Sequence, residues 1–296
     1  MRTLFTFILA FAAFSGAVAQ PSGFSPGSDH AALRLLGTSL ADIDTDAITL
    51  PRSESSSLLA GIHIELEEDW HTYWQNPGDS GIPLDISWEL PDGFEAGKLH
   101  WPHPEPFEEG QLITYGYKNE SMIFQPLRIY PEAGDGSYEL HAQIEFLVCR
   151  EACLPGFEEL SLSVEVQNGQ IYPAESGHQE LFERFMAGLP VPLEAAGRYE
   201  QQGNELILEF PETLRAEAAR FLGDEASGQD NLYFYAAEEN ITEASAPQQF
   251  TFRDGRLVGT TQVSRYRNEA LSDEFSGVLV MKEADNVSAI ELLFRQ

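Results

Sequence analysis

A long run of alternating apolar and polar residues in the middle of the chain constrains its fold most. The apolar positions of this run are Tyr138, Leu140, Ala142, Ile144, Phe146 and Val148. Successive side chains of a β-strand point to opposite faces, so the run predicts a strand in a sheet with one buried face. A second alternating run covers 160–166, and a third begins near Leu58. Short strands of this kind, separated by Pro and Gly turns, predict an all-β fold built around a β-sandwich.

The amino-terminal residues have the pattern of an export signal. Arg2 supplies a positive charge, residues 4–14 are apolar, and Ala17-Val18-Ala19 offers a small-x-small cleavage pattern. This arrangement predicts a signal peptide at residues 1–19, with Gln20 as the first mature residue. We therefore expect export to the periplasm.

The remaining patterns divide the chain into segments. We expect a leader at 20–44, a β-sandwich domain at 45–170, a linker at 171–194 and a second, smaller β-rich domain at 195–296. Leu181, Phe182 and Phe185 recur at helical spacing, which predicts a short helix in the linker. Gly188 and Pro190 then end this helix. Strand-like segments resume at 206–210, 232–235, 250–252, 257–263, 277–281 and 289–294, with a brief helical run at 212–222.

The charge of the chain excludes some partners. The formal net charge is −31, and phosphate binding needs Lys and Arg, so we expect no nucleic acid as a partner. Beyond the signal no apolar stretch is long enough for a spanning helix, so we expect no stable membrane insertion. The acidic surface is best explained as a device for solubility.

The sequence contains two cysteines, Cys149 and Cys153, at C-x3-C spacing. On a regular helix, Cβ atoms four positions apart lie about 5–6 Å from each other, whereas a disulfide needs about 3.5–4.5 Å. A tight turn between two strands permits the bond. The sequence provides this context, because one strand ends at Val148 and Pro155-Gly156 opens the next.

Three roles for the cysteine pair are open from the residues alone. A structural disulfide that closes so short a ring contributes only about 2 kcal/mol, against about 4.7 kcal/mol for a hundred-residue ring. Metal binding needs a further ligand, and no His or third Cys lies at ligand spacing nearby. A redox pair is therefore favoured over these two. Arg150 next to the pair would favour a thiolate, and Glu151 would oppose it.

Four separated motifs keep a fixed order along the chain. They are Asp69-Trp70-His71-Thr72-Tyr73-Trp74-Gln75-Asn76-Pro77-Gly78-Asp79-Ser80-Gly81, Trp101-Pro102, Tyr115-Gly116-Tyr117 and Cys149-Arg150-Glu151-Ala152-Cys153-Leu154-Pro155. Over roughly residues 45–168, this set resembles the amino-terminal periplasmic domain of the thiol:disulfide interchange protein DsbD family, and more closely its ScsB branch. Residues 195–294 look like the second periplasmic domain of ScsB-type proteins.

The resemblance implies an immunoglobulin-like domain that accepts electrons from a transmembrane domain and passes them to periplasmic disulfide proteins. Carried over by position, Cys149 and Cys153 would be the redox pair. The residues that would cap or line the site are Tyr115, Gly116, Tyr117, Tyr73 and Trp74. The aromatic residue at the tip of the DsbD cap falls near Thr114, so we expect shielding to pass to the two neighbouring tyrosines.

We therefore expect a soluble periplasmic thiol–disulfide exchange module, an oxidoreductase-type electron carrier that needs no cofactor and no metal. Its partners would be thioredoxin-like or disulfide isomerase-like periplasmic proteins and a membrane electron donor encoded separately. The alternative is a non-catalytic periplasmic protein-binding β-sandwich with a structural disulfide. Relatives occur in copper-tolerance settings, but the chain has no Met/His cluster for direct copper binding.

Overall fold

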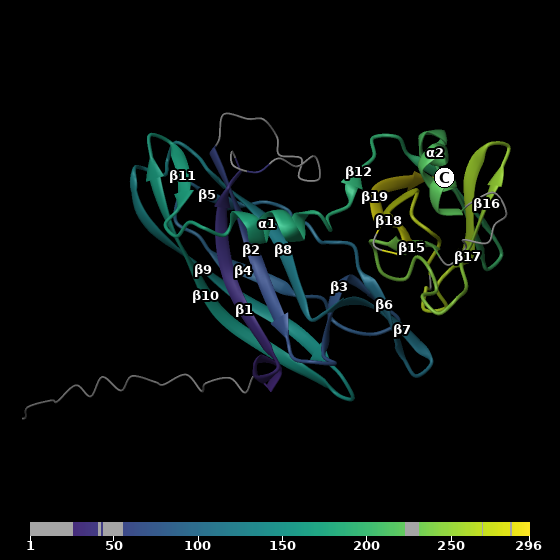
Figure 1. The fold of residues 1–296 in the computed structure, drawn as a ribbon, viewed down its shortest axis with the longest axis horizontal. Coiled ribbons are helices and arrows are strands. Elements are labelled where there is room, and N and C mark those ends of the chain that lie inside the picture. The colour runs from purple at the N-terminus through teal and green to yellow at the C-terminus, as the bar shows by residue number, and fades with distance from the viewer. Residues whose placement is uncertain (1–25, 41–42, 44–55, 223–230, 268, 285) are drawn as a thin grey trace, which may run out of the picture.

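The computed structural model describes residues 26–40, 43, 56–222, 231–267, 269–284 and 286–296. The expected signal peptide, residues 1–19, lies outside these ranges. Two β-rich halves lie side by side, and the segment that contains α1 and β12 joins them (Figure 1). Among the described helices, none has the length and apolar character needed to cross a membrane.

The first half runs from η1 to β11. Its elements are η1 (Pro26–Asp29), β1 (Ala31–Ser39), β2 (Ser56–Leu66), β3 (His71–Gly78), β4 (Asp85–Glu89), β5 (Phe94–Ala96), β6 (Glu105–Glu109), β7 (Leu112–Lys118), β8 (Glu120–Ile129), β9 (Gly136–Cys149), β10 (Cys153–Gln167) and β11 (Gln170–Pro173). One sheet has the order β1-β2-β8-β5, and the other has the order β11-β10-β9-β3-β7-β6, with β4 paired to β9. The two sheets enclose a common core, as in an immunoglobulin-like β-sandwich.

The long alternating run forms strand β9, as its period predicts. Its buried side chains are Leu140, Ala142, Ile144, Phe146 and Val148, and Cys149 at the end of the strand is buried too. β9 pairs antiparallel with β10 along its whole length, from Gly136 opposite Val166 to Cys149 opposite Cys153. The all-β prediction is confirmed, and the cysteines lie at the closed end of this hairpin.

The first strand of the sandwich, β1, begins before residue 45, where the sandwich was expected to start. β1 falls inside the expected leader at 20–44 and pairs with β2 from Ala31 opposite Leu66 to Ser39 opposite Leu58. Ala31 and Leu35 point into the core from this strand, which explains why it pairs rather than remaining a loose leader. The leader assignment is therefore wrong for residues 31–39.

Helix α1 (Gln179–Met186) forms where the spacing of Leu181, Phe182 and Phe185 predicted a helix. Phe182 and Met186 are buried against Leu59 and Phe124, on the side of the β1-β2-β8-β5 sheet that faces away from the sandwich core. The helix is therefore packed against the first half.

The second half runs from β12 to β19. Its elements are β12 (Val191–Pro192), β13 (Gly197–Gln202), β14 (Glu205–Glu209), η3 (Glu212–Leu214), α2 (Arg215–Leu222), β15 (Leu232–Ala236), β16 (Gln249–Arg253), β17 (Arg256–Gln262), β18 (Glu274–Glu283) and β19 (Asn286–Arg295). The strands form one sheet in the order β15-β18-β19-β13-β14-β17-β16, with β12 paired to β19. Phe210, Phe234 and Phe294 pack together in the core of this half. Tyr235 and Val278 belong instead to the core of the first half, so apolar packing crosses the boundary.

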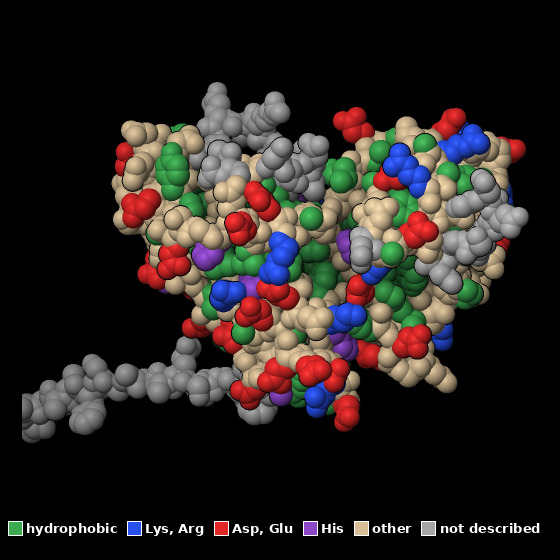
Figure 2. All heavy atoms as spheres, in the orientation of Figure 1, with side chains coloured by type: hydrophobic (Ala, Val, Ile, Leu, Met, Phe, Trp, Pro, Cys, Tyr) green, Lys and Arg blue, Asp and Glu red, His purple; other side chains and the backbone are tan. Residues whose placement is uncertain are grey.

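Acidic side chains are spread over both halves on the face drawn in Figure 2, where Lys and Arg are fewer. This distribution agrees with the net charge of −31. Because the negative charges are dispersed, the surface itself does not indicate one particular site.

Candidate functional site

The candidate site is the disulfide between Cys149 and Cys153 at the end of the β9–β10 hairpin. The two residues face each other across the hairpin with their Cα atoms 4.1 Å apart, and Arg150 to Ala152 form the turn. Cys149 is 2% exposed, whereas Cys153 is exposed to solvent. A thiol from another protein can therefore reach the sulfur of Cys153 more readily than that of Cys149.

Tyr73 on β3 places a hydroxyl next to the buried sulfur. The hydroxyl donates to Sγ of Cys149 at 2.7 Å and lies 3.6 Å from Sγ of Cys153. The pairing of β3 with β9 creates this contact, because His71 lies opposite Cys149 two positions before Tyr73. Burial, reinforced by the nearby Glu109 carboxylate, raises the pKa of Tyr73 well above its usual value, so the phenol stays protonated as a donor.

A polar pair lies beside this tyrosine. Nε2 of His71 is 2.8 Å from Oε1 of Glu109, and the Thr114 hydroxyl donates to the same carboxylate oxygen at 3.1 Å. The His71 ring stacks on Phe107 at 4.8 Å and meets the Tyr73 ring edge-on at 5.5 Å. The β6–β7 hairpin thus brings Phe107 and Glu109 to the disulfide face, although neither was expected from the sequence.

The loop after β3 supports the Tyr73 ring. A Cβ atom on Gly81, whose φ is +122°, would lie 2.3 Å from that ring. The loop is fixed to β7, because Asp79 exchanges hydrogen bonds with the backbone of Ile113 through its N–H and its carboxylate, each at 2.9 Å. The loop at 79–81 therefore helps to set the position of Tyr73.

The two tyrosines expected to cap the disulfide lie on the other side of the sheet. Tyr73 pairs directly with Gly116 on β7, and directly opposed residues share a face. Tyr115 and Tyr117 flank Gly116, so their side chains point to the opposite face. Their hydroxyls bond to the Tyr233 hydroxyl at 3.0 Å and to the carbonyl of Pro102 at 2.7 Å, respectively. Tyr115 and Tyr117 therefore do not shield the sulfurs, contrary to the expectation from the sequence.

Gly116 and Trp74 also have different surroundings from those expected. A Cβ atom on Gly116 would lie 1.8 Å from the carbonyl oxygen of Thr72, so this glycine allows β7 to approach β3 closely. Trp74 follows Tyr73 on β3, is 0% exposed, and lies edge-on to Tyr235 at 6.1 Å. It therefore packs between the halves rather than lining the disulfide.

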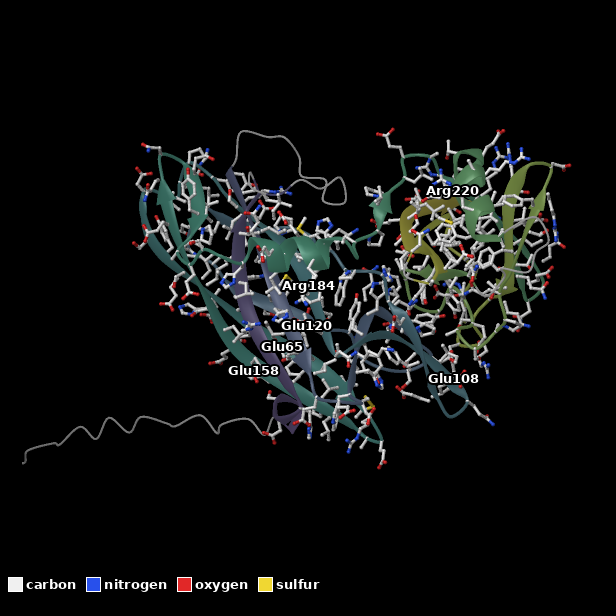
Figure 3. All side chains as sticks on the ribbon, in the orientation of Figure 1. Glu65, Glu108, Glu120, Glu158, Arg184 and Arg220 are labelled. Atoms are coloured by element: carbon white, nitrogen blue, oxygen red, sulfur yellow. A yellow bond between two sulfur atoms is a disulfide. The ribbon has the colours of Figure 1, made fainter. Side chains whose placement is uncertain are left out.

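A second group of titratable residues lies near α1. One ligand-type atom each of His63, Glu65 and Glu120 lie within 4.8 Å of one another. Arg34 Nη2 is 2.9 Å from Nδ1 of His63 and 3.4 Å from Glu65, and Arg184 Nη2 is 2.8 Å from Glu120. Figure 3 labels Glu65, Glu120 and Arg184 of this group. Two arginines thus neutralise the cluster, which joins α1 to the sheet as an ion-pair network.

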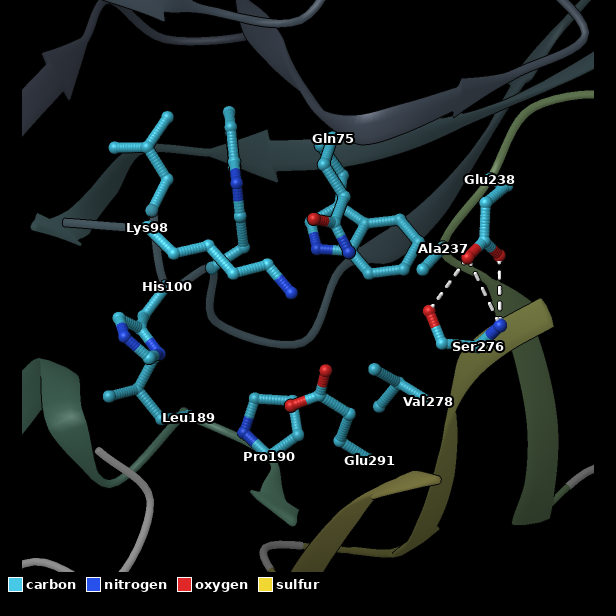
Figure 4. A pocket seen from close by; sticks show the side chains of 13 residues that line it. Gln75, Lys98, His100, Leu189, Pro190, Ala237, Glu238, Ser276, Val278 and Glu291 are labelled. Atoms are coloured by element: carbon cyan, nitrogen blue, oxygen red, sulfur yellow. Dashed lines mark hydrogen bonds between the residues drawn. The ribbon is translucent and has the colours of Figure 1, made fainter. Parts of the chain in front are cut away.

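A cavity of about 270 Å³ lies where the halves meet (Figure 4). Gln75 and His100 line it from the first half, and Glu238 lines it from the second half. Glu238 is engaged by the Ser276 N–H and hydroxyl. Trp74, which follows Tyr73 on β3, also lines the cavity, whereas neither cysteine does.

Fold and site together define a class of protein: an immunoglobulin-like β-sandwich followed by a β-rich half, with a hairpin disulfide between one buried and one exposed cysteine. Residues 44–165 match the family described as "Thiol:disulfide interchange protein DsbD, N-terminal". This match confirms the resemblance to DsbD, a family whose name links it to thiol–disulfide exchange.

A solved structure extends the likeness to nearly the whole chain. The N-terminal periplasmic domain of ScsB from Proteus mirabilis superposes with a TM-score of 0.60 at 18% identity, covering 92% of this chain and 96% of that one. At this identity the likeness shows a shared fold. No curated protein matches the sequence.

Proposed function

We propose that the protein is a periplasmic thiol–disulfide exchange module that passes reducing equivalents to other proteins through Cys149 and Cys153. The observation that carries this proposal is the asymmetry of the pair. Cys153 is an exposed residue, whereas Cys149 is buried and its sulfur accepts a hydrogen bond from the hydroxyl of Tyr73. Exchange through a mixed disulfide needs one accessible attacking cysteine and a second cysteine close enough to resolve the bond, and this pair provides both.

The forward reaction has two steps. The Cys153 thiolate attacks one sulfur of a partner disulfide, which breaks the partner's bond and releases its other sulfur as a thiolate. The Cys149 thiolate then attacks Sγ of Cys153, which forms the intramolecular bond and expels the second partner sulfur. Two electrons and two protons have then passed from the module to the partner.

Reduction of the module runs through the same atoms in reverse. A donor thiolate attacks Sγ of Cys153, and Cys149 departs as a thiolate. A second donor thiolate then attacks the donor sulfur of this mixed disulfide, which forms the donor's own disulfide and releases Cys153 as a thiolate. The Tyr73 hydroxyl, 2.7 Å from the sulfur of Cys149, donates a hydrogen bond to the departing charge. His71 and Glu109 hold the polar surroundings of the tyrosine in place.

The cellular setting of the proposal rests on two observations. The first residues have the pattern of an export signal, and the similar Proteus mirabilis structure is described as a periplasmic domain. Disulfides persist in that compartment. We propose thioredoxin-like or disulfide isomerase-like proteins as acceptors and a membrane electron donor as the source of electrons.

A redox titration tests this function. The protein is equilibrated in glutathione buffers, the oxidised fraction is measured by alkylation and mass analysis, and folding is followed by circular dichroism. We expect a reversible two-electron transition between about −120 and −270 mV, the range of thiol–disulfide oxidoreductases. Both states should remain folded.

The competing function gives a different result. A structural disulfide in a protein-binding module would stay oxidised throughout, because structural bonds have potentials below about −300 mV. Alternatively, the protein would unfold on reduction. Either outcome would replace the exchange function with the binding function.

A further inference from the structure

The turn between the cysteines contacts a tryptophan from the neighbouring strand. Trp70 directly precedes β3, whose register places His71 opposite Cys149 and therefore carries Trp70 towards Arg150. The guanidinium carbon of Arg150 lies 5.4 Å from the centre of the Trp70 ring, within the range of a cation–π contact. Trp70 is 5% exposed, so this contact is made at a fixed side chain.

The first described residues of the chain hold this tryptophan. The ring of His30 stacks on Trp70 with centroids 4.0 Å apart and planes 11° from parallel. Nδ1 of His30 is 2.8 Å from a carboxylate oxygen of Glu67, and the backbone N–H of Glu67 donates to the carbonyl of His30 at 3.0 Å. His30 is thus tied to the chain just before Trp70 by its side chain and its backbone.

The same amino-terminal segment touches the other arm of the hairpin. A Cβ atom on Gly27 would lie 2.7 Å from the backbone nitrogen of Gly156 and 2.8 Å from the carbonyl oxygen of Leu154. The Ser28 hydroxyl donates to the carbonyl of Phe157 at 3.2 Å. Gly27 therefore lies directly on the backbone that follows Cys153.

We propose that Gly27–His30 and Trp70 form a brace that keeps the 150–152 turn closed when the disulfide is reduced, with Trp70 as the positioning residue. This inference rests on the exchange function proposed above. The turn can open only if Arg150 leaves Trp70 or if residues 154–156 move away from Gly27. Both movements break contacts that do not depend on the sulfur–sulfur bond.

The brace acts on the equilibrium between dithiol and disulfide. The covalent bond itself holds the oxidised turn closed, so removing the brace releases conformations mainly in the reduced protein. The reduced state then gains entropy, and the disulfide forms less favourably. The brace therefore makes the cysteine pair a stronger reductant than an unbraced hairpin would be.

The test is the equilibrium with glutathione, in which two glutathione thiols reduce the Cys149–Cys153 bond and form one glutathione disulfide. For Trp70→Leu and for Arg150→Gln, we expect the equilibrium constant for disulfide formation to fall roughly three- to tenfold. Trp70→Phe keeps a ring for both contacts and should stay within about twofold of the wild type. Arg150→Gln leaves the core intact, so it tests the contact between Arg150 and Trp70 even if Trp70→Leu does not fold.

Trp88→Leu is the matched control, because Trp88 on β4 pairs with Ala142, far along β9 from the cysteines. We expect this variant to lose stability without a shift in the equilibrium constant. An unchanged constant in Arg150→Gln and in folded Trp70→Leu would overturn the brace, as would an equal shift in Trp88→Leu. If the wild type itself reaches no equilibrium with glutathione, the exchange function fails. If the wild type does so and the variants match it, the brace alone fails.

Discussion

The hydroxyl of Tyr73 lies 2.7 Å from Sγ of Cys149, on the side of β3 that faces away from the second half. Exchange at Cys153 expels the Cys149 thiolate, so the hydroxyl stabilises the sulfur that gains charge. A hydrogen bond to a charged group contributes about 1.5–3 kcal/mol, which corresponds to at least a tenfold change in rate.

Tyr73→Phe should therefore slow reduction of the disulfide by dithiothreitol at pH 7 by at least roughly tenfold, as measured by stopped flow. Tyr138→Phe is the control, because the Tyr138 hydroxyl bonds only to the carbonyl of Gly134 among the described contacts. Equal rates in wild type and Tyr73→Phe would show that the hydroxyl does not assist the departing thiolate.

Loss of the disulfide should have a small effect on stability. The bond closes a ring between residues only 4 positions apart, which limits its entropic contribution to about 2 kcal/mol. The β9–β10 pairing that continues to Val166 opposite Gly136 should hold the hairpin without it. Urea unfolding of the Cys149→Ser, Cys153→Ser double variant tests this estimate. A double variant that does not fold would show that the bond is structural.

Tyr115 should matter for stability and not for exchange. Its ring is 1% exposed and lies edge-on to Tyr235 at 4.9 Å, on the face opposite the sulfurs. Tyr115→Ala should lower the free energy of unfolding by about 3–5 kcal/mol, as for other large buried aromatics, and leave the rate of reduction unchanged. Tyr172→Ala, at a side chain that is 44% exposed, should change stability by less than about 0.5 kcal/mol. Faster reduction of Tyr115→Ala would restore the idea that this tyrosine caps the disulfide.

Local patterns in the sequence predicted much of the fold. The alternation from Tyr138 to Val148 predicted β9, and the C-x3-C spacing predicted a disulfide in a turn after it. The helical spacing of Leu181, Phe182 and Phe185 predicted α1. These features depend on neighbours in the chain, which is why a single sequence contains them.

The surroundings of the disulfide depend on pairings between distant segments, and the sequence did not reveal them. Tyr73 and Trp74 are adjacent aromatic residues, but alternation sends one to Cys149 and the other to Tyr235. Glu109 reaches His71 only because β6 and β7 form a hairpin that folds back beside β3. The capping role of Tyr115 and Tyr117 was inferred from their position in the motif. That position does not tell which face of β7 their side chains occupy.

The stability of the second half should depend on pH through Glu243. Burial alone would raise the pKa of this carboxyl, but hydrogen bonds from the Arg265 side chain and backbone and from Ser245 hold it below its usual range. A lowered pKa in the folded state adds stability above the unfolded value of about 4.3 and loses it as the pH falls through the folded value.

Glu243→Gln should therefore lower the free energy of unfolding by about 2 kcal/mol at pH 7, with a smaller difference from wild type below about pH 4. Urea unfolding at both pH values measures this. Glu205→Gln, at an exposed position of β14, is the control and should have little effect at either pH. A difference that is the same at both pH values would contradict the role of the ionised carboxylate.

Trapping of partners in the periplasm of the source cells tests the exchange function most directly. Cys149→Ala removes the resolving cysteine and leaves the exposed Cys153 to hold a partner as a mixed disulfide. We expect this variant to accumulate adducts that dithiothreitol releases, and we expect far fewer from Cys153→Ala, whose remaining sulfur is buried. If Cys149→Ala yields no more adducts than the variant that lacks both cysteines, the protein does not exchange disulfides with partners through Cys153.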